Sequence, residues 1–95
     1  MEIRIIADIT AAKGFEEELR EQLLSLAVES IKEAGCITYT VHCDTERSDR
    51  FFIYEVWQNA EKLEEHKESV HFQNFLSVSE KTLANLDVHL IDALN

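Results

Sequence analysis

The sequence has no proline and only two glycines and two cysteines among its 95 residues. Because Gly14 and Gly35 stand alone, there is no glycine-rich loop of the kind that binds phosphate groups. No apolar run approaches the roughly 20 residues that a membrane-spanning helix needs. The N-terminal MEIRIIADIT contains acids and alternates polar with apolar residues, unlike a signal peptide. We therefore expect a cytoplasmic protein with no membrane partner.

Basic residues are scarce as well. Nine Lys and Arg stand against 19 Asp and Glu, which gives a formal net charge of −10. Nucleic-acid binding depends on cationic side chains that neutralise phosphates, so this composition argues against a nucleic-acid partner. The length predicts a single domain over residues 1–95. A domain of this size buries only about 60–65% of the surface of its unfolded chain, so self-association would add useful burial.

The two cysteines, Cys36 and Cys43, fall in one segment with strand character. Seven residues of extended chain span roughly 23 Å, and the Cα atoms of a disulfide lie within about 7 Å. Their odd spacing predicts side chains on opposite faces of the strand. We expect free thiols and no metal site built on this pair, which suits a reducing compartment.

Hydrophobic periodicity predicts the elements of the first half of the chain. Residues 2–10 alternate as in a strand. Phe15 begins a helical stripe that continues to Ala34, with three glutamates in its first turn, and Gly35 is expected to end this helix in a left-handed conformation. Residues 36–44 and 50–57 are rich in β-branched and aromatic residues and predict a hairpin around a polar turn.

The second half predicts two helical pieces and a last strand. Residues 60–67 form a short charged helix, residues 71–85 a longer helix, and residues 86–93 a strand. The order βαββαβ indicates a ferredoxin-like α+β fold, with a four-stranded antiparallel sheet and its helices on one face.

The strands are apolar on both faces. A sheet covered by helices on one side should carry polar residues on the other, yet Ile6, Ile91, one of Phe51 and Phe52, and one of Ile53 and Tyr54 fall there. An apolar sheet surface is normally covered. The simplest cover is a second copy related by a two-fold axis, so we expect a homodimer.

An aromatic and histidine-rich pattern runs from Gly35 to Phe75, with the spacing E-x-W…L-x-x-H-x-x-x-x-H-F-x-x-F. Its members are Gly35-Cys36 with Tyr39, the run FIYEVW at 52–57, Leu63 with His66, and His71-Phe72 with Phe75. In these residues the chain resembles the antibiotic-biosynthesis-monooxygenase family. The resemblance covers nearly the whole chain and implies a dimeric α+β barrel. Family members include cofactor-free oxygenases of quinols and anthrones, haem-degrading monooxygenases, and an isomerase of the phosphorylated autoinducer-2 signal.

Two branches of the family can be weighed by residue. Haem-degrading members use an asparagine, a tryptophan and an axial histidine where this chain has Ala7, His66 and Leu76. Leu76 cannot ligate iron, which argues against haem degradation. The run RFFIYE at 50–55, with His66-Lys67 and His71, is closer to the autoinducer-2 branch. A phosphorylated ligand needs cations, however, and Arg4, Arg50 and Lys67 are the obvious candidates.

His66 and His71 lie five positions apart across the predicted helix break. Either could be a general base near neutral pH, or each could brace the break, with Ser69 as a helix cap. His42 and His89 lie on strands, and no histidine spacing typical of metal sites occurs. We expect no metal.

Three further residues have both a functional and a structural interpretation. Tyr39 and Trp57 could stack on a planar substrate or could belong to the core. Glu55 is a lone acid in an apolar strand: buried, it would have a raised pKa, and otherwise it would face a cation. We favour the cation.

The resemblance implies a monooxygenase that needs no flavin, haem or metal and acts on a small electron-rich aromatic such as a quinol, phenol or anthrone. His66, assisted by His71, would remove a substrate proton. Tyr39, Trp57, Phe72 and Phe75, with Glu55, would form the pocket. Two alternatives remain open: an isomerase of a phosphorylated autoinducer-2-like molecule, and a non-catalytic dimeric metabolite-binding or stress-response protein.

Overall fold

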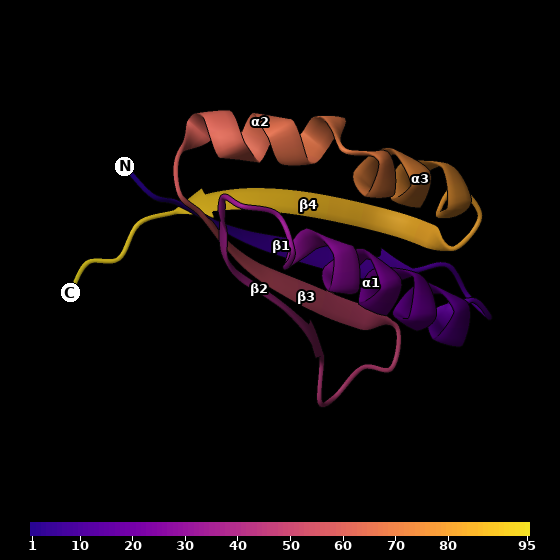
Figure 1. Ribbon diagram of the computed structural model, residues 1–95. Helices are drawn as coiled ribbons and strands as arrows, with labels where there is room; N and C mark the ends of the chain where they lie inside the picture. The colour runs from indigo at the N-terminus through magenta and orange to yellow at the C-terminus, as the bar shows by residue number, and fades with distance from the viewer.

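The computed structural model describes residues 1–95 and contains four strands and three helices. Their order is β1 (Ile3–Ala11), α1 (Glu16–Ser30), β2 (Cys36–Cys43), β3 (Arg50–Trp57), α2 (Ala60–Glu68), α3 (Val70–Val78) and β4 (Leu83–Ile91). The strands form one antiparallel sheet in the order β2-β3-β1-β4, and the three helices lie on one side of it (Figure 1). The predicted ferredoxin-like α+β fold is confirmed. None of the helices has the length and apolar character of a membrane span.

Alternation along the central strands separates the two faces of the sheet. In β1 the buried residues are every second one, and in register with them β3 places Phe51, Ile53 and Glu55 on the same face. Leu19 and Leu23 of α1 and Trp57 of β3 are fully enclosed against this face. Burial of each such large apolar side chain contributes roughly 1.5–3 kcal/mol, so this layer is the main source of stability.

The first helix is shorter than its periodicity predicts. Helix α1 ends at Ser30 and the chain turns through residues 31–35, where Ile31 is largely exposed. Gly35 is not left-handed, so the prediction of a glycine-terminated helix is wrong; the one positive φ is that of Gly14, at 88°. A Cβ at Gly35 would collide with the side chain of Lys62. Glycine therefore serves close packing of this turn against α2 rather than helix termination.

A β-bulge changes the prediction for the two cysteines. The register of β2 against β3 shifts between Cys36 and Thr38, which leaves Ile37 about half exposed. Because of this extra residue, Cys36 and Cys43 both lie opposite core-facing residues of β3, Trp57 and Phe51. The expected opposite orientation is thus wrong, while both thiols are free as predicted.

The boundary between α3 and β4 also differs from the prediction of a helix to residue 85. Helix α3 ends at Val78, and Ser79 closes it by donating its N–H to the Phe75 carbonyl. The Thr82 hydroxyl donates to Gln22 of α1 at 2.6 Å, which fixes the tight turn before β4. Leu83 then begins the strand, three residues earlier than the apolar alternation indicates.

The face of the sheet that no helix covers carries several large apolar and aromatic side chains. Ile6, Phe52 and Tyr54 lie on it, so the choices left open between neighbouring residues are settled: Phe51 and Ile53 face the core. Ile6, Phe52 and Tyr54, together with His42 of β2, line a shallow, almost wholly apolar hollow of about 380 Å³ on this face.

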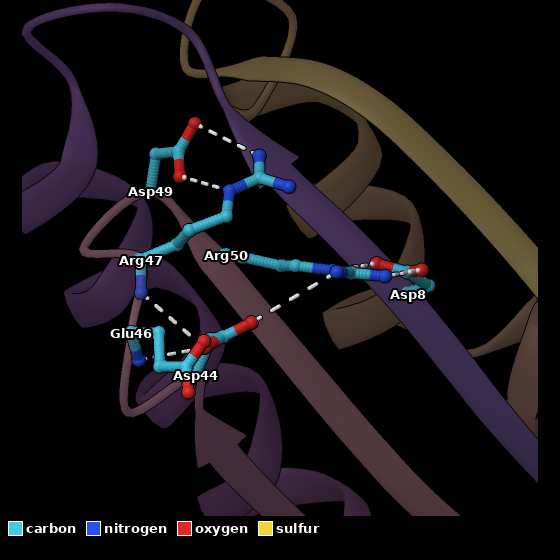
Figure 2. Close-up of polar contacts among 6 residues, drawn as sticks. All are labelled: Asp8, Asp44, Glu46, Arg47, Asp49 and Arg50. Carbon is cyan, nitrogen blue, oxygen red and sulfur yellow. Dashed lines mark hydrogen bonds and ion pairs between the residues drawn. The ribbon is translucent and has the colours of Figure 1, made fainter.

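An ion-pair network lies at the β2–β3 turn and the adjoining ends of β1 and β3 (Figure 2). The Arg50 guanidinium donates two hydrogen bonds to Asp8 of β1, at 3.0 and 2.6 Å, and its plane lies over the Phe52 ring. Asp44 lies 3.9 Å from Arg50 and accepts the backbone N–H of Arg47. These contacts fix the turn relative to the sheet. The Arg50 bond lowers the pKa of Asp8.

Candidate functional site

The site consists of one carboxylate that joins two histidines. Glu33 Oε2 lies 2.6 Å from His66 Nδ1 and 2.7 Å from His71 Nε2. His66 is only 2% exposed, while the side chains of Glu33 and His71 retain 17% and 22% of their surface. The cluster therefore lies at the boundary between the core and solvent, with His66 on the inner side.

The break between α2 and α3 brings the two histidines together. In one continuous helix, residues five apart would point about 140° away from each other. Here α2 stops at Glu68, and Ser69 adopts an extended conformation and caps α3 by accepting the Phe72 N–H. Its hydroxyl also donates to the His66 carbonyl at 2.6 Å. The predicted capping role of Ser69 is confirmed, and the bend it produces directs both imidazoles to Glu33.

The turn after α1 supplies the carboxylate. The backbone of Glu33 donates to the Ser30 carbonyl and accepts from the Cys36 N–H, so the residue is held at both sides. Gly35, two residues further along this turn, accepts from the Gln58 N–H just before α2. This backbone hydrogen bond joins the turn to the start of α2 and so places Glu33 beside His66, 33 positions later in the sequence.

Aromatic rings enclose His66. Its ring centroid lies 4.4 Å from that of Trp57, 5.0 Å from Phe72 and 5.8 Å from Tyr39. This burial lowers the pKa of His66, against an opposing contribution from its hydrogen bond to Glu33. A neutral imidazole that donates Nδ1–H to Glu33 presents the lone pair of Nε2, the atom that accepts a proton in general-base catalysis.

Glu55 adds a second acid behind the aromatic rings. It is 8% exposed, and its Oε1 accepts the Trp57 indole N–H at 2.9 Å. The expected cation partner is wrong: the partner is the indole. Burial raises the pKa of Glu55, and the bond from Trp57 only partly offsets this.

Two other titratable groups of this region are poorly suited to ionise. Burial, helped by neighbouring acids, raises the pKa of the Cys36 thiol to about 11. Burial likewise raises the pKa of Tyr39 far above its usual range. A nucleophilic role for Cys36 thus has no support in its surroundings, because the thiolate is the reactive form.

A groove between α1 and α3 opens beside the cluster. It has a volume of about 380 Å³, and His71 and Phe75 line it together with Glu18, Glu21 and Glu29. Phe75 thus lines this groove, and its ring also belongs to the buried apolar cluster that contains Tyr39 and Trp57. Six of the seven residues predicted for the site, all but Phe75, form one continuous set around His66 and Glu33.

The sequence interpretation missed Glu33. It fell inside the overlong first helix, where a glutamate is an ordinary surface residue. The turn that ends α1 early is stabilised by contacts with Gln58 and Lys62, which lie far along the chain. The position of Glu33, two residues before the Gly35-Cys36 motif, was the one available signal.

Fold and site together describe a class of small α+β proteins in which aromatic rings enclose a buried histidine carried by a short helix. The model of the family described as antibiotic biosynthesis monooxygenase matches residues 2–77. The chain belongs to this family, as the resemblance predicts.

Solved structures agree with this assignment. A Pseudomonas aeruginosa protein is 35% identical and superposes with a TM-score of 0.95, over 99% of this chain and 95% of the other. A Bacteroides thetaiotaomicron protein described as a possible oxidoreductase is 30% identical, with a TM-score of 0.85 over 95% and 97% of the chains. A structure named antibiotic biosynthesis monooxygenase is 19% identical and matches in fold, with a TM-score of 0.90 over 98% and 99%.

A curated relative, an uncharacterized Synechocystis protein, is 30% identical over 69 residues. These cover 68% of this chain, which spans about half (47%) of the relative's length. The relative therefore supports kinship and carries no information on activity.

Proposed function

We propose that this chain is a cofactor-independent monooxygenase of a small electron-rich aromatic substrate, such as an anthrone or quinol, with His66 as the base. The observation that carries the proposal is the 2.6 Å contact between His66 Nδ1 and Glu33. A carboxylate in this position holds the imidazole in one tautomer and stabilises the imidazolium that forms on proton uptake. The same pairing of a carboxylate with a histidine base occurs in the Ser-His-Asp catalytic triad.

The chemistry balances without a cofactor. Removal of a proton from an anthrone-like CH₂ leaves a carbanion that can reduce dioxygen. One oxygen atom forms the new carbonyl and the other leaves as water, so that R₂CH₂ and O₂ give R₂C=O and H₂O. In this scheme the protein supplies the base and orientation, and the rings of Tyr39, Trp57 and Phe72 give His66 surroundings of low polarity.

The cations argue against the phosphorylated-ligand alternative. The Arg50 guanidinium is bound by Asp8, Arg4 by Glu2 at 3.0 Å, and Lys67 by Glu64 at 3.2 Å. Each candidate cation already has a carboxylate partner, and none lies in the groove beside His71. A phosphate group would have to displace these partners in a protein of net charge −10.

We further propose that the working unit is a homodimer that buries the open sheet face. The chain exposes 6141 Å², about 500 Å² more than a typical monomer of its mass. The apolar hollow around Ile6, Phe52 and Tyr54 lies on this face. At the β4 edge, Val88 and Leu90 pair with core-facing Ala7 and Ile5, so they lie on the helix side of the sheet, where they are 54% and 69% exposed. Two free cysteines are consistent with a cytoplasmic location.

Oxygen uptake tests the proposed activity. Wild-type protein is assayed against a panel of anthrones and quinols, in air and under argon, without added cofactor. We expect oxygen consumption that falls at least about 100-fold in His66→Ala, while Glu64→Ala, an exposed change on the same helix, keeps full activity. Product formed equally under argon would favour an isomerase. Ligand-induced melting shifts without turnover would favour a binding protein.

A further inference from the structure

Glu33, His66 and His71 together form a possible set of metal ligands. The proposed reaction has no step that needs all three. His66 Nδ1, His71 Nε2 and a carboxylate oxygen of Glu33 all lie within 4.8 Å of one another. Two imidazole nitrogens and one carboxylate oxygen are the ligands with which Zn²⁺ and similar ions form sites that keep one position open. His71, which the base mechanism uses least, is one of the three.

The surroundings favour a cation. Glu18, Glu21 and Glu29 line the groove that leads to His71, and no Lys or Arg lines it. A cleft with walls of one charge sign concentrates the field and raises the local concentration of counter-ions. The groove therefore offers an entry path to the donor set from solvent.

The arrangement can adapt to an ion with small movements. Glu33 Oε2 lies 2.6 and 2.7 Å from the two imidazole nitrogens, and ligand atoms around a tetrahedral Zn²⁺ lie about 3.3 Å apart. The carboxylate must therefore withdraw by about 0.6–0.7 Å from the two nitrogens, and each of these nitrogens must be free of its proton. Glu33 belongs to a turn outside any helix and His71 lies in the first turn of α3, so side-chain rotation suffices for this change.

We propose that Glu33, His66 and His71 bind one divalent transition-metal ion of the Zn²⁺ type, with water as the remaining ligand. The site is mixed nitrogen and oxygen, which disfavours Mg²⁺ and Ca²⁺ because these prefer oxygen ligands throughout. The proposal depends on the cluster and not on the monooxygenase activity.

Metal binding has a consequence for the base. An ion on Nδ1 leaves the ring proton of His66 on Nε2, so the lone pair that would accept a substrate proton is lost. The ion is therefore an inhibitor of the proposed reaction, and the same residues alternate between a proton-accepting and a metal-bound state. Metal binding would therefore inhibit the proposed monooxygenase activity.

Binding is tested directly with untagged full-length protein and Zn²⁺ or Co²⁺ at pH 7. Equilibrium dialysis is expected to give one Zn²⁺ per chain, and Co²⁺ to give visible absorption of a four-coordinate site. Excess Mg²⁺ should not displace either ion. His71→Asn and Glu33→Gln, both at partly exposed positions, should weaken binding at least about tenfold.

Two control variants distinguish metal coordination by Glu33, His66 and His71 from non-specific binding of cations to an acidic protein. His89→Asn removes an exposed imidazole on β4, and Glu21→Gln removes a groove acid outside the donor set; both should still bind one Zn²⁺ per chain. Equal binding by wild type, His71→Asn and Glu33→Gln would overturn the proposal, as would displacement by Mg²⁺. Oxygen uptake that survives while no Zn²⁺ binds would refute the metal site alone, and bound Zn²⁺ without oxygen uptake would refute only the monooxygenase.

Discussion

Glu33 and His66 are joined by a 2.6 Å contact between Oε2 and Nδ1, across 33 residues of sequence. The pair combines a turn residue with an almost fully enclosed ring. Breaking such a contact leaves a polar group poorly satisfied in the core, which costs about 1–3 kcal/mol.

The first prediction concerns the tautomer of His66. In Glu33→Gln the amide can still accept a hydrogen bond, but it cannot stabilise an imidazolium as a carboxylate does. We expect oxygen uptake to fall about 10²–10⁴-fold with little change in KM. Nitrogen NMR should detect the Nδ1–H form of His66 in wild type. An unchanged rate in Glu33→Gln would remove Glu33 from the mechanism, and Glu29→Gln serves as the control in the neighbouring groove.

The second prediction concerns Glu55, whose pKa is raised by burial. The folded state holds the Glu55 proton more firmly than the unfolded state does. The contribution of Glu55 to stability is therefore fully present below the unfolded pKa, near 4.3, and is lost as pH rises through the folded pKa. In Glu55→Gln, which keeps an acceptor for the Trp57 indole, this loss should disappear. Urea unfolding at pH 4.5 and 7.5 measures it, with exposed Glu80→Gln as the control; parallel pH profiles for wild type and Glu55→Gln would contradict it.

The third prediction concerns Asp8, whose pKa is lowered by its bond with Arg50. Such a group stabilises the fold above its unfolded pKa, near 3.9, and the contribution is lost as pH falls through the folded pKa. Asp8→Asn should cost up to about 1 kcal/mol at pH 7, since the pair is partly exposed. The difference from wild type should vanish near pH 2. A difference that stays constant with pH would show that packing, rather than charge, is responsible; Asp92→Asn is the control.

The sequence predicted the layer structure well because the strands alternate and α1 has a clear apolar stripe. The run RFFIYEVW begins and ends where β3 does, at Arg50 and Trp57. Errors cluster where distant contacts decide the backbone. Thr82 binds Gln22 across 60 residues to end the α3 segment, and periodicity within the segment carries no signal of that bond.

The sequence predicted which histidines and aromatic residues form the candidate site, but not the carboxylate that hydrogen-bonds to both histidines. Histidines and aromatic residues in one segment can be identified from spacing, and the structure brings His66, Trp57 and Phe72 together. The carboxylate that links the histidines comes from a turn whose position depends on Gly35 packing against Lys62. Such a tertiary contact is invisible to local pattern, so the hydrogen-bonded cluster emerged only from the fold.

The last prediction concerns the open sheet face. If two copies bury this face, a charge introduced at its centre lies in a desolvated contact in both copies at once, and an unpaired buried charge is costly. Tyr54→Glu should therefore weaken self-association at least about 100-fold, equivalent to about 2.7 kcal/mol, and leave the fold intact. Light scattering at micromolar concentration should give twice the 11.0 kDa chain mass for wild type and a single chain for Tyr54→Glu. Leu76→Glu, an apolar-to-acid change on exposed α3, should remain dimeric. A wild-type monomer under these conditions would refute the homodimer, because a stable interface buries at least about 1,000 Å² and withstands such dilution.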